Sequence, residues 1–540
     1  MASTTVPTRS VVLPALLRRR GRIADLLGVA GGALIVLLQA FDGGGYFPVQ
    51  YLAAGVAALV GSAVLLVVRG ATWRPGIHGL VAAAGLVGLG AWTGISSRWS
   101  PLPDVAVTEM QRQISYAAIL GFGLVAVGPG RRARLLVLAI GGALVTIALA
   151  GFAGRLLPGL GLTSAREEAF GVYRLSYPIN YWNAQGAAAA MAAAFCLGLA
   201  GDRRSAPWLR GLAAGLVPLL AVTLLLTVSR GAIVAAVVGA AVVVALARRP
   251  LQTLLVSAVV AVPTAIAVAI AATTPAVIDD PSLTPGLDQA GPQVAVATVG
   301  LGALAGVGAV IALQLLLRRE KRRRLRGPQL GRTQRIVALA TVVLLVLGLG
   351  GTAVVAGRVD GEAAGQVSSF RRFLDEQRQE FLAAGPATGT GADRLSTASG
   401  TRSAGYRVAW HGFTADPLLG DGVGGFRVRW LRERTTGERI VNAHSLPLET
   451  LGELGLPGFA LLLAFLGAVA AGAIRGRLRP TVLSRAQAAG ATGAITAFLT
   501  SCLLDWTWQM GALTAAALLL AATLLPEGRR HRRSPGAPAA

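Results

Sequence analysis

The sequence has few cysteines and few charged side chains, and each shortage excludes a class of protein. Only Cys196 and Cys502 occur among 540 residues, and both fall within apolar runs. Two such cysteines provide neither a disulfide framework nor the ligand spacing of a zinc site. Charged residues make up 14% of the chain, whereas soluble domains usually carry about 25%. The deficit indicates long helices that face lipid rather than a series of soluble domains.

Lysine is absent except for Lys321, so nearly all basic side chains are arginines. With 50 basic and 25 acidic residues, the formal net charge is +25. Such a charge first suggests nucleic acid as a partner. The arginines, however, lie in short clusters between apolar runs. This distribution is the positive-inside pattern of a membrane protein and argues against a nucleic-acid partner.

Apolar runs long enough to cross a bilayer recur along the chain. A membrane-spanning helix needs about 20 mostly apolar residues, and the runs predict an all-α bundle of about fourteen spans. We expect these spans near 24–40, 50–68, 77–95, 114–129, 133–153, 183–200, 209–227, 230–247, 251–272, 292–317, 336–356, 446–473, 485–504 and 509–525. The first run follows an arginine cluster and has no clear small-residue cleavage site. We therefore interpret it as a retained signal anchor.

The arginine clusters alternate with the predicted spans and thereby predict an orientation. If the N-terminus is cytoplasmic, every second connection should be rich in arginine. These connections contain Arg69 and Arg74; Arg131, Arg132 and Arg134; Arg203, Arg204 and Arg210; Arg248 and Arg249; Arg318 to Arg326; Arg475, Arg477 and Arg479; and Arg529 to Arg533. The opposite short loops are poor in arginine or acidic. We expect a multi-pass protein of the plasma (inner) membrane with both termini in the cytoplasm.

One connection is far longer than the others and is predicted to lie outside the cytoplasm. The expected organisation is a cytoplasmic arm at 1–23, helices 1–11 within 24–356, a large extracytoplasmic loop at 357–445, helices 12–14 within 446–525 and a cytoplasmic tail at 526–540. Within the loop, Phe370, Phe373, Leu374 and Phe381 recur at roughly helical spacing and predict an amphipathic helix on the membrane surface. Residues 387–404 are rich in Gly, Ser and Thr and predict a flexible segment.

Arg230 lies between two apolar runs, within Val228-Ser229-Arg230-Gly231. An arginine at a membrane boundary is costly unless it is paired or solvated. A guanidinium binds phosphate oxygens through a bidentate fork, which makes Arg230 a candidate to bind an anionic substrate. The alternative interpretation is a side chain that extends to the polar interface from a helix end.

His444 lies where the large loop returns to the membrane, within Asn442-Ala443-His444-Ser445. Imidazole accepts a proton near neutral pH, which suits a general base. Of the four histidines, His78 and His531 are predicted on the cytoplasmic side, and only His411 and His444 outside it. The alternative role of His444 is to cap a helix at the interface.

Two further outer segments carry residues that suit a carbohydrate or phosphate site. The segment from Tyr173 to Asn183 combines Tyr, Trp and Asn, which stack on sugars and hydrogen-bond to them, although aromatic residues here also form ordinary interfacial belts. Arg174 and Asn183 are its candidate substrate-binding residues. Residues 417–426, PLLGDGVGGF, permit a tight turn. They lack the context of a nucleotide P-loop, which leaves a structural turn as the simplest interpretation.

Together these segments resemble the O-antigen ligase and O-antigen polymerase superfamily. The resemblance is carried by YPINYWNAQGAAAAMA, TVSRGAIVAAVVGAAVVVAL, YRVAWHGFTADPLLGDGVGGFRV and NAHSLPLETLGELGLPGFALLL. The order matches as well, because the Ser-Arg-Gly element precedes the long outer loop and the histidine closes it. The resemblance covers about residues 170–475. It implies an architecture similar to the C superfamily of membrane-embedded glycosyltransferases.

The resemblance implies an enzyme that uses a glycan carried on a polyprenyl diphosphate and needs no cofactor. A ligase moves the glycan onto a lipid or cell-wall glycan acceptor, a polymerase extends a repeat-unit chain, and both remain open. By position, Arg230 matches the family's membrane arginine and His444 the loop-closing histidine. Arg407 is the first match for the loop arginine, and Arg402 is the alternative. We expect His444 to take the acceptor proton and the arginines to stabilise the diphosphate leaving group.

A metal clamp on the diphosphate is not expected, because the sequence contains no Asp-x-Asp motif. The main alternative to an enzyme is a transporter of lipid-linked sugar or a small anion, and a non-catalytic envelope scaffold is a second. Transporters often contain inverted repeats, and no repeat is evident here. Glu449 and Glu453 are the nearest candidates for midplane carboxylates. Transport of labelled solute by proteoliposomes would separate a carrier from an enzyme.

The predicted orientation is tested by cysteine-accessibility labelling in intact cells. Ser399→Cys should react with an impermeant thiol reagent, because residues 357–445 are expected outside. Ser205→Cys should not react, because its arginine-rich connection is expected in the cytoplasm. Labelling of Ser205→Cys by the impermeant reagent would overturn the orientation.

Overall fold

The computed structural model describes residues 12–69, 75–127, 131–164, 167, 174–279, 286–323, 402–435, 437–478 and 483–525. Within these ranges the regular structure consists of helices, with no β-strand. Ten of the described helices are long and apolar enough to cross a membrane. These features confirm the all-α, polytopic membrane class that the sequence predicted.

Long helices follow one another along most of the described chain. They are α1 (Val12–Phe41), α2 (Pro48–Arg69), α3 (Ile77–Ile95), α4 (Pro103–Val127), α5 (Arg131–Leu156), α7 (Trp182–Ala200), α8 (Pro207–Leu226), α9 (Arg230–Leu246), α10 (Pro250–Ala272), α12 (Leu287–Arg323), α18 (Leu446–Leu478), α19 (Arg485–Leu504) and α20 (Gly511–Leu524). The shorter elements are α11 (Pro275–Ile278), α16 (Arg402–Ala415), α17 (Gly425–Glu433) and the 3₁₀ turns η1 (Gly43–Gly45), η2 (Ser96–Arg98), η3 (Pro158–Leu160) and η5 (Thr507–Gln509).

Each predicted span other than the one near 336–356 coincides with one of these helices. That span, and the amphipathic helix predicted around residues 370–381, lie outside the described residues. The end of the segment predicted to be flexible, residues 402–404, forms the start of α16. The span predicted at 114–129 belongs to a longer helix, α4, which begins at Pro103. Its polar half continues the helix because the bundle buries and pairs Arg112 rather than exposing it to lipid.

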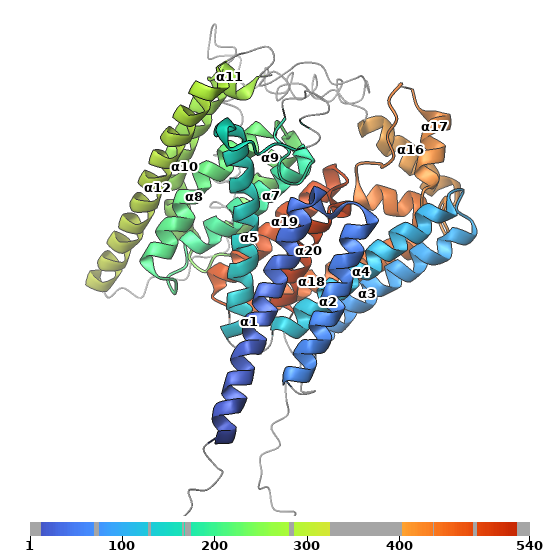
Figure 1. The fold of residues 1–540 in the computed structure, drawn as a ribbon, viewed down its shortest axis with the longest axis horizontal. Coiled ribbons are helices and arrows are strands. Elements are labelled where there is room, and N and C mark those ends of the chain that lie inside the picture. Colours follow the sequence, from blue (N-terminus) through green and yellow to red (C-terminus); the bar gives the residue numbers. More distant parts are fainter. Residues whose placement is uncertain are drawn as a thin grey trace, which may run out of the picture.

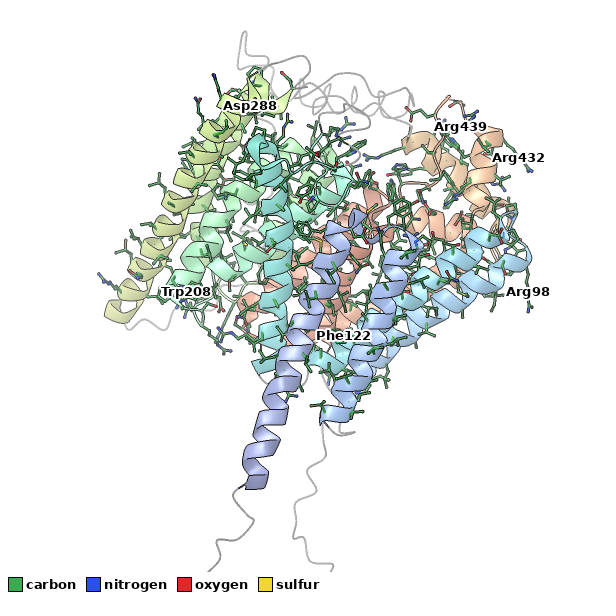
Figure 2. The ribbon with its side chains drawn as sticks, in the orientation of Figure 1. Arg98, Phe122, Trp208, Asp288, Arg432 and Arg439 are labelled. Carbon is green, nitrogen blue, oxygen red and sulfur yellow. The ribbon has the colours of Figure 1, made fainter. Side chains whose placement is uncertain are left out.

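The large loop and the N-terminal arm attach to opposite ends of the bundle. Figure 1 shows α16 and α17 at one end and the start of α1 at the other. Arg432 and Arg439 mark the loop end in Figure 2, whereas Trp208, in the first turn of α8, lies near the other end. The predicted orientation requires the large loop and the N-terminal arm to lie on opposite sides of the membrane, and this arrangement agrees with it. Which side faces the cytoplasm stays a prediction. Ser205 is buried, and its hydroxyl donates a hydrogen bond to Asp202. Its exposed neighbour Ala206 is therefore the better position for cysteine labelling.

α7 occupies the centre of the bundle because its side chains are small. Its sequence contains the run AQGAAAAMAAA, and 16 of its 19 residues are buried. Small residues let membrane helices approach closely, and here α5, α8, α9 and α19 all contact α7. Gly186 lies against Ala232 of α9, and Gly198 lies against Gly490 of α19. The start of α7 is therefore held at the middle of the loop end of the bundle.

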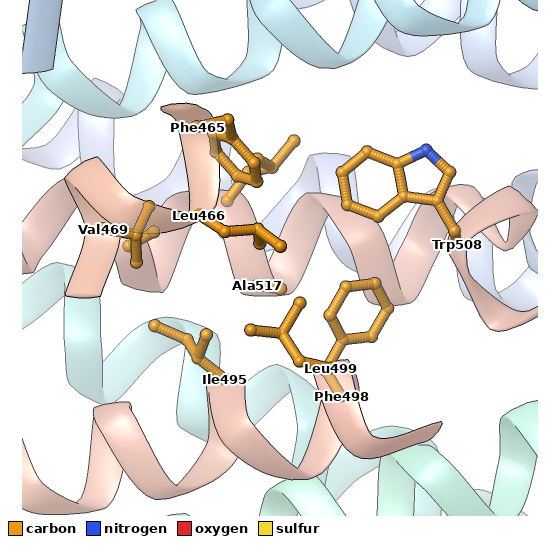
Figure 3. A pocket seen from close by; sticks show the side chains of 10 residues that line it. Phe465, Leu466, Val469, Ile495, Phe498, Leu499, Trp508 and Ala517 are labelled. Carbon is orange, nitrogen blue, oxygen red and sulfur yellow. The ribbon is translucent and has the colours of Figure 1, made fainter. Parts of the chain in front are cut away.

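Glycines in α1 and α2 leave room for the large side chain of Phe122, which belongs to α4. The ring of Phe122, labelled in Figure 2, fits against α1 and α2. A Cβ atom at Gly31 would lie 3.1 Å from this ring, and one at Gly61 would lie 2.8 Å from it. Figure 3 shows a small apolar cavity between α18, α19 and α20, lined by residues such as Phe465, Phe498 and Trp508. Its apolar lining marks it as a packing gap in the core.

α18 is interrupted where the glycine-rich turn meets it. Gly455 has φ +60° and ψ −163°, which is not helical. The N–H of Leu456 donates instead to the carbonyl of Pro417 at 2.9 Å, and the N–H of Asp421 donates to Gly452 at 2.9 Å. The helix predicted at 446–473 is thus present but kinked at Gly455, and its first turns pack with the loop. Residues 417–426 form a structural turn, with positive φ at Gly420, Gly422 and Gly424.

Close packing of α7 against α19 predicts the effect of adding one methyl group. A Cβ atom at Gly198 would lie 2.5 Å from the Cα atom of Gly490, where backbone leaves it no room. We expect Gly198→Ala to destabilise the fold by about 1–3 kcal/mol, the usual cost of overpacking. Gly142→Ala on α5 is the matched control, because nothing lies within 4 Å of its Cβ position. Equal thermal unfolding midpoints for the two variants in detergent would contradict this packing.

Candidate functional site

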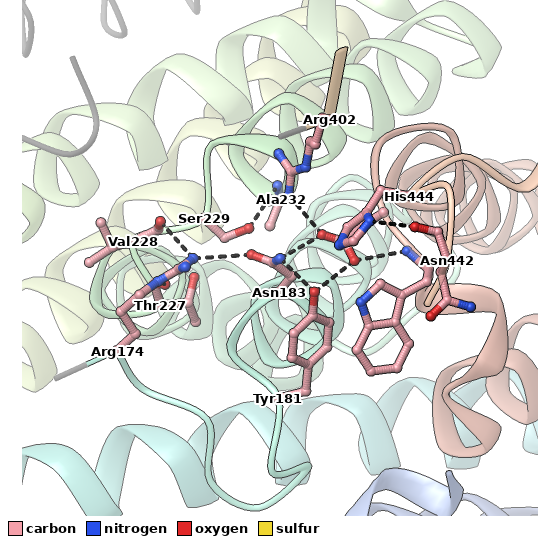
Figure 4. A network of polar contacts seen from close by, with 12 residues as sticks. Arg174, Tyr181, Asn183, Thr227, Val228, Ser229, Ala232, Arg402, Asn442 and His444 are labelled. Atoms are coloured by element: carbon pink, nitrogen blue, oxygen red, sulfur yellow. Dashed lines mark hydrogen bonds and ion pairs between the residues drawn. The ribbon is translucent and has the colours of Figure 1, made fainter. Parts of the chain in front are cut away.

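Asp505, which follows α19, is the centre of a buried polar network that includes Tyr181, Asn183 and Arg402, whose side chains are labelled in Figure 4. Its side chain is 4% exposed. The carboxylate accepts hydrogen bonds from the Tyr181 hydroxyl at 2.7 Å and from the backbone N–H of Trp506 at 2.8 Å. It also accepts one from Asn183 Nδ2 at 2.5 Å and forms an ion pair with Arg402 at 2.8 Å. These donors replace the water that a buried carboxylate loses.

Arg174 extends the network to the connection between α8 and α9. Its guanidinium donates to Asn183 Oδ1 at 3.1 Å and to the carbonyls of Thr227 and Val228, both at 2.9 Å. It also lies 4.6 Å from the ring centroid of Trp182, within the range of a cation–π interaction. Arg174 and Asn183, both predicted as substrate-binding, are therefore brought together, and the contacts of both fix this corner of the site.

Arg230 begins α9, two residues after the Val228 carbonyl that Arg174 holds. Ser229 caps this helix, because its hydroxyl accepts the N–H of Ala232 at 3.4 Å. The half-buried Arg230 is therefore located at the N-terminus of α9, which is the positive end of the helix dipole. A helix N-terminus with a guanidinium on its first turn favours an anionic group.

The two alternative loop arginines separate in the structure. Arg402 begins α16 and reaches Asp505, whereas Arg407 is exposed on the same helix. Burial opposes the charge of Arg402, but the nearby Asp505 and Tyr181 outweigh it and raise the pKa of Arg402. Its side chain remains 30% exposed, so part of it is still accessible. The structure thus joins Arg402, and not Arg407, to the network.

His444 lies beside the Asp505 network in an uncommon backbone conformation, with φ +57°. Its Nδ1 atom lies 3.0 Å from the carbonyl of Asn442, and the Tyr406 hydroxyl donates to the His444 carbonyl at 3.3 Å. When Nδ1–H donates to Asn442, the lone pair is on Nε2. Burial lowers the pKa of His444 below its ordinary value. The imidazole is consequently neutral, and able to accept a proton, near neutral pH.

His411, the other histidine predicted outside, is not part of this network. It is 58% exposed, and its Nδ1 atom lies 2.9 Å from Glu433. Arg429 pairs with Glu433 at 3.0 Å and with Asp421 at 2.6 Å. The contact between His411 and Glu433 joins α16 to α17 at the surface. The hydrogen bonds that Arg429 donates to Asp421 and Glu433 raise the pKa of its guanidinium.

The arrangement offers guanidinium groups, amides, an aromatic stack and an imidazole in one region. Trp506 stacks on Tyr181 with 4.3 Å between ring centroids and 27° between ring planes. Arginines suit phosphate oxygens, and aromatic and amide groups suit sugars. In the part of the chain that the structure describes, no group of three or more His, Cys, Asp or Glu is placed to hold a metal ion.

Sequence reasoning missed Asp505, and it assigned Tyr181 no role beyond its aromatic segment. Asp505 stands alone between two apolar runs, in LLDWTWQM. An isolated carboxylate at the edge of the membrane is costly without a partner, and this was the signal that would have identified it. Its partner Tyr181 is 324 residues away in the sequence, so local patterns carry no trace of the pairing.

Residues 294–463 match the family model described as O-Antigen ligase. The matched region begins in α12, ends in α18 and includes Arg402 and His444. Arg174, Arg230 and Asp505 lie outside it. A search of curated proteins finds no match to the chain.

The ion pair between Arg402 and Asp505 predicts different effects for the two loop arginines. Arg402→Ala removes the cation next to a buried carboxylate, and breaking such a pair costs about 3–5 kcal/mol. We expect the lower end of this range, because Arg402 keeps some contact with solvent. Arg407→Ala is the matched control on the same helix and should leave stability unchanged. Denaturation of both variants in detergent tests this, and equal midpoints would mean that the pair does not hold α16 in place.

Proposed function

Because residues 294–463 match the O-Antigen ligase family model, we propose that the chain is a membrane glycosyltransferase that transfers a glycan from a polyprenyl-diphosphate carrier to a hydroxyl acceptor outside the cytoplasm. The acceptor is a lipid or cell-wall glycan for a ligase and a growing glycan chain for a polymerase. The observation that carries the proposal is the neighbourhood of His444, Arg402 and Asp505 at the loop end of the bundle.

Arginines would bind the donor diphosphate and stabilise its developing charge. Arg230 offers a guanidinium at the positive end of α9. Arg402 is held by Asp505 through one nitrogen and keeps part of its surface accessible. Arg174 and Asn183 support this arrangement by fixing the α8–α9 connection. Donors placed where charge develops lower the barrier, each typically by about 3–4 kcal/mol. Charge neutralisation by arginine makes the proposed reaction independent of metal.

His444 would act as the general base for the acceptor. The acceptor oxygen forms a bond to the anomeric carbon while the bond from that carbon to the diphosphate oxygen breaks. Nε2 of His444 takes the hydroxyl proton, and the polyprenyl diphosphate leaves with the electron pair. Burial keeps the imidazole neutral before the reaction. A transporter, by contrast, would move the lipid-linked sugar without forming a glycosidic bond.

The proposal is tested by product formed per folded molecule, with a chelator present. His444→Ala should insert normally and lose about 10²–10⁴-fold in rate, the usual contribution of a general base. Arg230→Lys should also be impaired, because an ammonium cannot reproduce the planar fork of a guanidinium. His411→Ala is the matched control and should retain wild-type turnover.

The pH dependence of the same assay provides a second check. Activity requires neutral His444 and should fall as pH decreases through its pKa, which burial lowers below the ordinary value. The midpoint of the acid limb should therefore lie below about 6.5. Wild-type turnover of His444→Ala, or loss of activity in His411→Ala alone, would refute the assignment of the base. A requirement for Mg²⁺ or Mn²⁺ would refute the arginine mechanism.

A further inference from the structure

Glu449, in the first turns of α18, is bonded to the segment that precedes His444. Its Oε2 atom accepts the backbone N–H of Ala443 at 2.7 Å. Its Oε1 atom lies 3.4 Å from Nδ2 of Asn442 and 3.4 Å from Nε2 of Gln509. Asn442 Nδ2 also donates to Gln509 Oε1 at 2.9 Å, which closes a ring of three side chains. This ring joins the end of the large loop, α18 and η5.

The ring holds the two residues on which the conformation of His444 depends. A non-glycine residue with positive φ is strained and persists only where its surroundings fix it; His444 has φ +57°. The Asn442 carbonyl accepts Nδ1–H of His444, and the Asn442 side chain belongs to the ring. The Ala443 N–H is held by Glu449 itself. Both Asn442 and Ala443 are buried, so protein groups must replace water as their partners.

We propose that Glu449 is the positioning residue of the general base: by holding Asn442 and Ala443 it sets the place and the ring orientation of His444. Glu449 acts through His444 and does not touch the substrate. The inference rests on the proposed function only in taking His444 as the base. Gln509 transmits the same constraint from η5, four residues after the Asp505 that holds Arg402. The base and the loop arginine are thereby fixed to one short connection.

Glu453 is a matched control on the same helix. It lies about one turn after Glu449, and both side chains accept backbone N–H groups of the loop. Glu453 binds Gly424 and Phe426, at 2.9 Å and 3.2 Å, in the glycine-rich turn rather than near His444. The two glutamates therefore make the same kind of hydrogen bond to different segments. Glu453 binds the glycine-rich turn, and Glu449 binds the residues next to His444.

The test measures kcat and the donor KM per folded molecule for Glu449→Gln, Glu449→Ala and Glu453→Gln. A misplaced catalytic group costs about 10²-fold, so Glu449→Ala should lower kcat by that order while the donor KM stays unchanged. Glu449→Gln should be intermediate, because an amide oxygen still accepts the Ala443 N–H. Glu453→Gln should retain the wild-type kcat per folded molecule even if less of it folds. If Glu449→Ala does not fold, the same split in Glu449→Gln decides the question.

A double-mutant cycle separates this inference from the proposed function. Glu449→Ala should have no further effect on turnover in a His444→Ala background, because its effect passes through that side chain. Loss of rate in His444→Ala with wild-type kcat in both Glu449 variants would overturn the positioning role and leave the base intact. Independent, multiplying losses would also overturn it. Wild-type turnover of His444→Ala would overturn both proposals together.

Discussion

A carboxylate withdrawn from water must be surrounded by donors, and Asp505 imposes this requirement on the loop end of the bundle. Two of its donors come from the start of α7 and one from the start of α16. Asn183 is at once a donor to Asp505 and an acceptor for Arg174, which holds the backbone just before α9. Asp505 thus fixes Arg402 directly, through the ion pair. It fixes the start of α9, where Arg230 lies, indirectly through Asn183 and Arg174.

The connection between α19 and α20 controls the site from both of its ends. Asp505 at its start holds the arginine of α16, and Gln509 near its end contacts Asn442 and Glu449 beside the base. Gln509 is itself anchored, because its backbone carbonyl accepts a hydrogen bond from Arg112 of α4 at 2.7 Å. Residues proposed for leaving-group stabilisation and for proton transfer therefore share one rigid support, as preorganised catalysis requires.

Hydropathy predicted the helices because a bilayer demands apolar runs of a certain length. It could not predict the places where a helix contains buried polar residues or is interrupted by a packed loop, and these were found only in the structure. The start of α4 was missed because Arg112 is buried and paired, and the break at Gly455 was missed because it depends on a loop packed against it. Arg402 and Arg407 are five residues apart, on different faces of one helix. A motif gives their order in the chain but not the face that meets Asp505, whose own partners are remote in sequence.

The pairing of α7 with Asp505 has a consequence for the biosynthesis of the protein. Polypeptides leave the ribosome from the N-terminus, and Tyr181 precedes its carboxylate partner by 324 residues. Most of the membrane helices must therefore be inserted before this part of the site can form. A nascent or prematurely terminated chain that lacks the final two helices has neither Asp505 nor Gln509. Such a chain cannot hold the arginine and the histidine together, so this part of the site forms only after the connection between α19 and α20 has been synthesised.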